Sequence, residues 1–344
     1  MLSNLIKLAE RGTLPDFLIR IGIRKLCKVR LDYIEKSGPE YIEKHHQEWV
    51  EKLKKSPIAL VPEKANEQHY EVPPEFFNLV LGKHLKYSSG YWLDNKISLD
   101  DSEEIMLEKT CSRAELVDGQ LILELGCGWG SLTCYMAKKF PNSKIIAVSN
   151  SSDQRKMILK RCEFDNLKNV SVITVDMNVF SIDKKFDRVI SVEMFEHMRN
   201  YEILFERISN WLKDDGKLFV HIFSHRELVY PFEDKGVGDW MAREFFSGGI
   251  MPSHKLLLHF SKHMSIESLW KVNGLHYSKT SLAWLKMMDK NKSRILGIFS
   301  KTYGNGQEKK WFQRWRIFFM SCEELFGYDK GTQWGVSHYR FSKI

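Results

Sequence analysis

The chain has 344 residues, 43% of them hydrophobic, which is enough to build one large domain or a core domain with sizeable additions. No stretch approaches the ~20 apolar residues of a membrane-spanning helix, and the six cysteines form neither a CxxC pair nor a zinc-type cluster with histidine. The net charge is +8, but beyond the N-terminus acidic and basic residues are interleaved, so no basic stripe indicates nucleic-acid binding. We therefore expect a cytoplasmic, globular protein with free thiols and no metal site.

Residues 1–65 are predicted to form a basic helical segment, broken near Pro39 and again at 57–62. Before position 31, seven lysine and arginine residues are balanced by only two acidic residues. A solvated face explains this pattern more simply than contact with an anionic membrane, which is the less favoured alternative. Residues 66–118 are predicted to be a second, mostly helical segment, with helix starts at 73–74 and 102–104 and a polar-aromatic loop between them.

From residue 119 onward, short apolar runs alternate with helical patterns, which predicts βαβ units in a doubly wound, mostly parallel α/β sheet of the Rossmann-like type. A helical insertion is expected at about 224–275, followed by more helices and a last, antiparallel strand, so that the core spans 119–344. Right-handed crossovers bring the carboxyl ends of the parallel strands to one edge, where a ligand would bind. Strands are predicted at 121–125, 144–148, 170–175, 186–192, 217–223 and 334–341.

A glycine-rich loop follows the first predicted strand and reads Gly126-Cys127-Gly128-Trp129-Gly130. A dinucleotide-binding loop would have the spacing G-x-G-x-x-G, but here Ser131 stands at the third glycine position. Glu124, just before the loop, suits a cationic group such as the amino group of methionine. These features favour S-adenosylmethionine over NAD, and hence a class I methyltransferase sheet.

Further cofactor contacts are expected where the second and third strands end. Asn150 and Gln154 could hydrogen-bond to ribose hydroxyls, and Asp176 could accept a hydrogen bond from the adenine amino group, with Met177 against the ring. Ordinary capping is the alternative, with Ser151 or the next serine starting a helix and Asp176 in a turn. The two interpretations are compatible.

Besides the glycine loop, a set of motifs occurs in order along the chain: His69-Tyr70, Phe76-Phe77, the loop at 87–92, the stretches 194–198, 246–249 and 252–253, His276-Tyr277, Trp284, the segment 314–323 and the final strand. Together they resemble the motifs of the cyclopropane-fatty-acid synthases and their relatives, the plant coclaurine-type N-methyltransferases. The resemblance covers roughly residues 66–344. It implies that Tyr87 and Ser88 contact the methionine part of the cofactor, that Gly126 and Gly128 lie under it, and that Asn150 and Gln154 hold the ribose.

The two branches that this resemblance joins differ at three positions. Cyclopropane synthases modify a lipid alkene with a bound bicarbonate as base, and they carry Cys where this chain has Ser89, Gly where it has Glu193, and usually an aliphatic residue where it has Phe223. Glu193 and Phe223 are the same as, or close to, the residues that the amine-methylating branch tends to have at these positions. The sequence therefore predicts an N-methyltransferase for a small secondary or tertiary amine, such as a benzylisoquinoline-like one.

An alkylamine must lose its proton before its lone pair can attack a sulfonium methyl group. Glu193, Glu196 and His197 follow the fourth strand, and a helical turn there would place all three on one face. We expect the carboxylates to attract the cationic amine and the imidazole to take its proton. The structural alternative is that His197 caps a helix and Glu193 pairs with a nearby arginine such as Arg199.

His221, Phe223 and Tyr277 are predicted to line the substrate pocket. His221, in an otherwise apolar strand, could equally be a hydrogen-bonded core residue, and Tyr277 could orient the substrate or only line the pocket. An aromatic wall around the amine could come from Trp240, Phe245, Phe246 and Trp334.

Three other functions fit less well. A lipid-modifying enzyme is opposed by Ser89 and Glu193. A nucleic-acid methyltransferase would usually have Asn or Asp, Pro-Pro and an aromatic residue after the fourth strand, where this chain has Ser191-Val192-Glu193-Met194-Phe195. A non-catalytic scaffold would not need the Glu193, Glu196 and His197 set. The sequence does not predict the oligomeric state.

Overall fold

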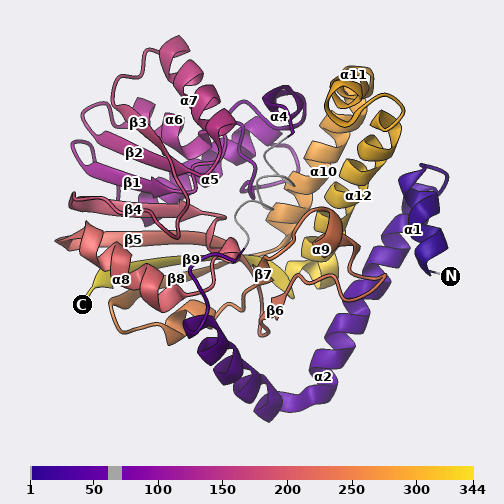
Figure 1. Cartoon of the computed structure of the whole chain (residues 1–344), viewed down its shortest axis with the longest axis horizontal. Coiled ribbons are helices and arrows are strands. Elements are labelled where there is room, and N and C mark those ends of the chain that lie inside the picture. Colours follow the sequence, from indigo (N-terminus) through magenta and orange to yellow (C-terminus); the bar gives the residue numbers. More distant parts are fainter. Residues whose placement is uncertain (1, 61–71) are drawn as a thin grey trace.

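A seven-stranded sheet forms the centre of the molecule (Figure 1), in a computed structural model that describes residues 2–60 and 72–344. The strand order is β3-β2-β1-β4-β5-β9-β8, with β1 to β5 parallel and β9 and β8 antiparallel. This confirms the predicted, mostly parallel sheet with an antiparallel last strand. The strands are β1 (Leu121–Leu125), β2 (Lys144–Ser149), β3 (Val170–Thr174), β4 (Phe186–Val192), β5 (Leu212–His225), β8 (Met264–Val272) and β9 (Trp334–Lys343).

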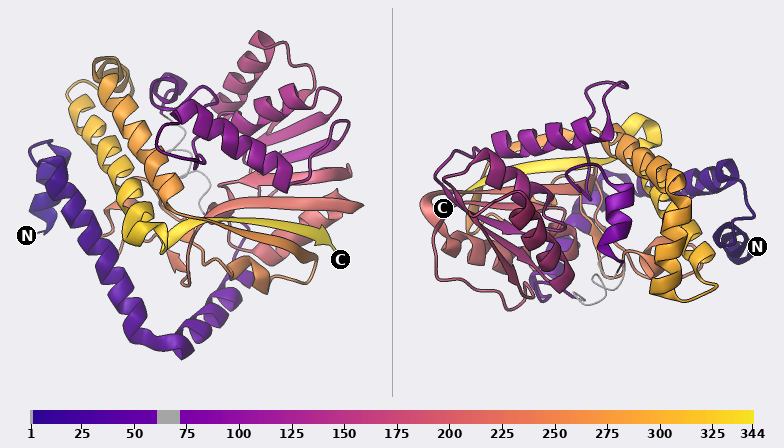
Figure 2. Two further views of the ribbon diagram at one scale, coloured as in Figure 1. Left: turned by 180° about the vertical axis from the view of Figure 1, so that it is seen from behind. Right: turned by 90° about the horizontal axis from the view of Figure 1, so that it is seen from above.

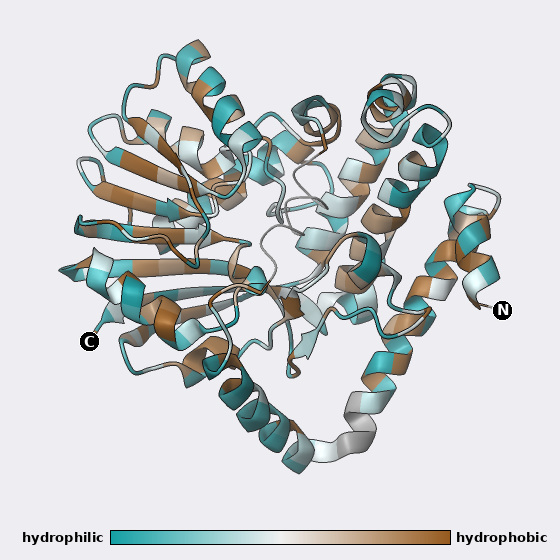
Figure 3. Cartoon of the chain, in the orientation of Figure 1, coloured by the Kyte–Doolittle hydropathy of each residue, from teal (hydrophilic) through white to brown (hydrophobic). Residues whose placement is uncertain are grey.

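Helices cover both faces of this sheet because the central strands are apolar on both sides (Figure 3). Side chains alternate between the faces of a strand. Leu123 and Val189 therefore face α8 (Tyr201–Trp211), whereas their neighbours Ile122 and Ile190 face the opposite layer. That layer contains α5 (Leu99–Arg113) and α6 (Ser131–Lys139), and α7 (Ser152–Phe164) packs beside β2 and β3.

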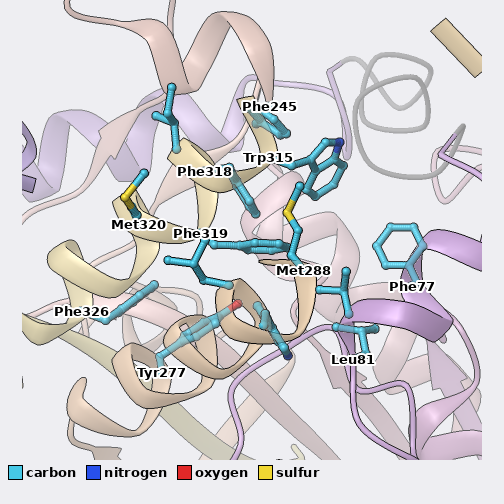
Figure 4. Close-up of a cluster of buried hydrophobic side chains, with 14 of the residues drawn as sticks. Phe77, Leu81, Phe245, Tyr277, Met288, Trp315, Phe318, Phe319, Met320 and Phe326 are labelled. Carbon is cyan, nitrogen blue, oxygen red and sulfur yellow. The ribbon is translucent and has the colours of Figure 1, made fainter. Parts of the chain in front are cut away.

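A helical lobe lies beside the carboxyl ends of the parallel strands (Figure 2). It is built from α4 (Pro74–Val80), α10 (Leu275–Lys290), α11 (Lys292–Tyr303) and α12 (Glu308–Gly327). Large apolar side chains fill its interior (Figure 4), which explains much of the high aromatic content of the chain. Those labelled in the figure are Phe77, Leu81, Phe245, Tyr277, Met288, Trp315, Phe318, Phe319, Met320 and Phe326.

The N-terminal segment contacts both parts of the molecule. α1 (Leu2–Glu10) is followed by the long α2 (Asp16–Lys54), which bends at Gly38, beside the proline where a break was predicted. The first half of α2 lies along α12, where Arg20 pairs with Glu323 and Glu324 at 2.7 and 2.8 Å. The second half enters the core under α8 through Leu53 and its neighbours. The segment is therefore packed into the fold at two separate places.

Two sequence predictions need correction. The stretch 224–275 is not simply helical, because it contains the edge strand β8 as well as β6 (Tyr230–Pro231), α9 (Trp240–Glu244), β7 (Ile250–Met251) and a 3₁₀ turn at Leu256–His259. Most residues of β8 are exposed or half-buried, so the strand lacks the continuous apolar run of a central strand. Helix α5 begins earlier than predicted, because Ser98 and Asp101 form a capping box ahead of Ser102.

Candidate active site

Two adjoining pockets open at the carboxyl ends of β1, β2 and β4, and Gly126, Gly128 and Glu193 line both. The empty space, with the open solvent at the mouths included, is about 760 Å³ in the larger pocket and about 580 Å³ in the smaller. All residues predicted to bind the cofactor lie around this continuous space. Asn150, Gln154, Asp176 and Met177 line the larger pocket, and Tyr87, Ser88 and Glu124 line the smaller.

The glycine loop presents bare backbone to this space. Gly126, Gly128 and Gly130 have φ values of 79°, 51° and 78°, in the left-handed region that favours glycine. A Cβ on Gly126 would lie 2.6 Å from the Cβ of Met194, whereas one on Gly128 would meet nothing within 4 Å. The loop therefore turns sharply into α6 and leaves room for a ligand at Gly128.

Buried polar atoms that find no partner in the described part of the chain also lie at these pockets. Ser131 Oγ and Trp129 Nε1 lie at the smaller pocket, and Gln154 Nε2 lies at the larger. Gln154 Oε1 accepts a hydrogen bond from Ser149 Oγ at 2.6 Å, and Ser151 Oγ caps α7, as predicted. Buried donors are normally satisfied, so these atoms fit a polar ligand with oxygen acceptors, as S-adenosylmethionine is.

Glu124 gives the smaller pocket a carboxyl group that is only 2% exposed. Thr133 Oγ1 donates a hydrogen bond to it at 2.5 Å. Burial raises the pKa of Glu124 to about 8, and no cation among the described residues offsets the loss of solvent. An ammonium group in this pocket would supply that missing charge.

Asp176 has a structural role as well as a place in the larger pocket. It accepts hydrogen bonds from the backbone and the side chain of Asn178 at 2.9 and 3.3 Å. Asn178 in turn exchanges two hydrogen bonds with the backbone of Ala59, which also lines this pocket. The turn after β3 therefore ties the N-terminal segment to the adenine end of the predicted site.

Glu193 does not share a helical face with Glu196 and His197, contrary to the sequence prediction. Its φ of 48° is left-handed, and the 3₁₀ turn η1 (Phe195–His197) begins only two residues later. The predicted alternative of a Glu193–Arg199 ion pair is also wrong. The guanidinium of Arg199 instead donates hydrogen bonds to the backbone carbonyls of Met198, Gly248 and Gly249.

Three donors surround the Glu193 carboxylate instead. Tyr277 Oη donates to Oε2 at 2.6 Å, while His221 Nε2 and the Ser89 backbone N–H approach Oε1 at 3.1 and 3.3 Å. Burial raises the pKa of Glu193 to about 7, and the nearby Lys86 ammonium limits that rise. The structure thus brings His221 and Tyr277 against Glu193, but His221, Phe223 and Tyr277 line neither pocket, contrary to the sequence prediction.

Lys86 is a residue of this site that the sequence analysis missed. Its Nζ is buried and donates hydrogen bonds to Ser88 Oγ at 2.5 Å and to the Ser89 carbonyl at 2.8 Å. Burial lowers its pKa to about 8, while the carboxylates of Glu193 and Glu103 oppose the shift. Only its position next to the Tyr87 loop could have indicated it.

The remaining predicted catalytic residues lie at different depths. His197 lines the larger pocket, with its ring centroid 4.9 Å from that of Phe246. Glu196 is 1% exposed and lines neither pocket, and within residues 2–60 and 72–344 its Oε2 has no hydrogen-bond partner. Burial, followed by repulsion from Glu193, raises the pKa of Glu196 well above its usual range.

None of the residues predicted to form an aromatic wall lines either pocket, although the Phe246 ring packs against His197, which does. Phe223 packs against Phe246 at 5.7 Å, and Ser247 and Gly248 beside it line the larger pocket. The others are core residues: Phe245 stacks on Phe318, Trp240 Nε1 donates to Glu10, and Trp334 Nε1 donates to Tyr230.

Comparisons with known proteins point to one group of enzymes. The family model described as mycolic acid cyclopropane synthetase matches residues 61–333. The chain is 36% identical over 347 aligned residues to the (S)-coclaurine N-methyltransferase of Thalictrum flavum subsp. glaucum. This alignment covers 100% of this chain and 96% of that protein. It is 30% identical to the cyclopropane-fatty-acyl-phospholipid synthase of Escherichia coli (strain K12), over 74% of this chain and 62% of that protein. A crystal structure of coclaurine N-methyltransferase bound to N-methylheliamine and SAH matches with a TM-score of 0.96 and 35% identity over 99% of both chains.

Proposed function

The chain belongs to the mycolic acid cyclopropane synthetase family and is an S-adenosylmethionine-dependent N-methyltransferase, and we propose that its substrate is a small secondary or tertiary amine of the benzylisoquinoline type. The observation that carries this proposal is the Glu193 carboxylate at the junction of the two pockets. A fixed carboxylate suits a cationic amine, whereas a lipid alkene offers it no charge to bind.

The cofactor is proposed to span both pockets. Its methionine portion would lie in the smaller pocket, with its amino group toward Glu124 and with Tyr87 and Ser88 over it, and its ribose would lie near Asn150 and Gln154. When bound, it supplies an electrophilic methyl group on a sulfonium centre.

The residues after β4 are proposed to prepare the amine. The Glu193 carboxylate attracts the protonated amine to the junction, and His197 accepts the proton from its nitrogen. Phe246, stacked near His197, limits access of water and offers an aromatic face to the cation. Glu196 lies behind this turn as a buried carboxyl group that keeps its proton, so it supports the turn beside Glu193 rather than contacting the amine.

We also propose that the chain is divided as its sequence suggests, with residues 66–118 covering the cofactor and substrate. The described part of this segment supplies Lys86, Tyr87 and Ser88 to the smaller pocket. His69 and Tyr70, which belong to the family resemblance, lie outside the described residues.

A lipid-modifying function draws less support than amine methylation. The plant N-methyltransferase matches the whole chain, whereas the bacterial lipid synthase matches about three quarters of it. Over residues 2–60 and 72–344, none of the helices combines the length and the hydropathy that a transmembrane span requires.

The test is release of S-adenosylhomocysteine with a panel of secondary and tertiary amines, including tetrahydroisoquinolines, and with phospholipid vesicles in a separate arm. We expect turnover of a ring-bearing amine and its loss in Glu193→Gln and His197→Ala, with S-adenosylhomocysteine binding retained. Glu206→Gln, at an exposed position on α8, serves as the matched control. Turnover with vesicles alone would overturn the proposal.

A further inference from the structure

Four side chains form a hydrogen-bonded line across the sheet and end at Glu193. His221 on β5 and His338 on β9 face each other in the antiparallel register, with His338 Nε2 2.9 Å from His221 Nδ1. Arg113 Nη1, at the end of α5, lies 2.7 Å from His338 Nδ1. At the other end, His221 Nε2 lies 3.1 Å from Glu193 Oε1. Both histidines are completely buried.

The guanidinium of Arg113 fixes the direction of every hydrogen bond in the line. A guanidinium can only donate, so His338 Nδ1 must accept. Burial holds the pKa of both imidazoles well below the usual range, so each ring carries a single proton. His338 therefore carries it on Nε2 and donates to His221 Nδ1. His221 must then carry its own proton on Nε2 and donate to Glu193.

We propose that Arg113 and His338 are positioning residues that fix the proton of His221 on Nε2, so that His221 always donates a hydrogen bond to Glu193. The proposal rests on the function proposed above, because it explains how the carboxylate at the amine site is held. Without the guanidinium, His338 could adopt its other tautomer, and the lone pair of His221 Nε2 could face the carboxylate.

Under this proposal, Glu193 and His197 have different roles in the pocket. His221, Tyr277 and the Ser89 N–H all donate to Glu193, so its oxygens act only as acceptors. The line cannot carry a proton out of the site, because an arginine in a protein does not give one up. Once ionised, Glu193 therefore holds the cationic amine, and the proton of the amine leaves through His197.

Arg113 is itself held in place for this role. Its guanidinium lies 4.9 Å from the ring centroid of Trp270, which pairs with His338 in the β8–β9 register. Its carbonyl accepts a hydrogen bond from Arg340 at 3.2 Å. Among the described residues, the other titratable groups that face Glu193 are Lys86, Tyr277, Glu196 and Cys322.

The first readout does not depend on the amine. The ¹⁵N NMR spectrum of histidine-labelled enzyme with S-adenosylhomocysteine reports which nitrogen of His221 is protonated, with the signal assigned by its loss in His221→Gln. We expect a protonated Nε2 and a bare Nδ1 in the wild type, and a mixture of tautomers in Arg113→Met.

The second readout is kcat/KM against pH with an amine that is turned over. We expect the acidic limb to move upward by on the order of one unit in Arg113→Met and His338→Leu, because Glu193 loses a donor to its charged form. Arg113→Lys and His338→Gln should restore the limb, since lysine still donates and the glutamine amide accepts at one atom and donates at the other. Arg188→Met is the matched control, because Arg188 is also half-buried but donates only to backbone carbonyls.

A wild-type His221 protonated on Nδ1 would overturn the inference, and so would an Arg113→Met enzyme with an unchanged spectrum and pH profile. An equal shift in Arg188→Met would also overturn it, since the effect would then be structural. Failure to find an amine substrate would count against the proposed function, but the NMR result would still decide the tautomer.

Discussion

Cofactor binding should draw a proton off Glu124, and the size of this effect follows from its burial. A carboxyl group with a pKa of about 8 is ionised in about 1% of molecules at pH 6 and about half of them at pH 8. If the ammonium of the cofactor pairs with the ionised form, affinity should rise about fifty-fold from pH 6 to pH 8. Binding should release about one proton at pH 6 and about half a proton at pH 8.

Calorimetric titration with S-adenosylhomocysteine, in two buffers with different ionisation enthalpies, measures both quantities. Methylthioadenosine is the matched ligand control, because it lacks the amino acid portion and should bind without releasing this proton. Glu124→Gln is the matched protein control, because the amide keeps the size of the side chain and cannot titrate. Equal proton release with the two ligands, or a fifty-fold rise that persists in Glu124→Gln, would show that the ammonium does not pair with Glu124.

Three further predictions concern the site and the stability of the fold. Tyr277→Phe deletes one hydrogen-bond donor to Glu193 and keeps the ring. We expect kcat/KM to fall by about 10- to 100-fold, because a hydrogen bond to a charged acceptor contributes ~1.5–3 kcal/mol. Unchanged kinetics would mean that this hydrogen bond does not contribute to catalysis. Burial raises the pKa of Glu103 from 4.5 to about 7, so the folded chain keeps a proton that the unfolded chain loses. This group should therefore reduce stability by about 3 kcal/mol as pH rises from 4.5 to 7, and Glu103→Gln should flatten that part of the slope in urea unfolding. Leu53→Ala should lower the free energy of unfolding by about 2–5 kcal/mol, because Leu53 is completely buried under α8, whereas Ile21→Ala, at a side chain 54% exposed, should change it by less than about 0.5 kcal/mol. Equal effects of these two substitutions would contradict the packing of α2 into the core.

The central strands could be predicted because their apolar runs reflect burial on both faces. β1 and β4 lie at the residues that the sequence indicates, and β2 and β3 each differ by one residue at one end. β8 could not be predicted in the same way, because an edge strand with exposed residues lacks that run. The start of α5 was placed too late because the cap at Ser98 lies in front of a second run of serine and acidic residues.

Some residues of the candidate site could likewise be predicted from the sequence, and others could not. Residues that follow a glycine loop or a strand end were gathered correctly around the pockets, because parallel topology brings strand ends together. The left-handed turn at Glu193 was missed, since a glutamate gives no signal for a positive φ. His338 was missed for a different reason: its bond to His221 joins residues 117 positions apart, and the register of β5 and β9 alone creates it.

The position of β9 sets the order in which this enzyme can mature during synthesis. β9 is the last strand of the chain, yet it lies inside the sheet between β5 and β8. Until it emerges from the ribosome, β5 exposes an open edge and β8 has no partner in the sheet, although the glycine loop and the strands around it are already made. A nascent chain could therefore assemble its cofactor half first, while the half that holds Glu193 through His221 waits until β9 has been synthesised. A product that stops before residue 334 would keep every residue predicted to bind the cofactor, and it would expose an unpaired edge that invites aggregation.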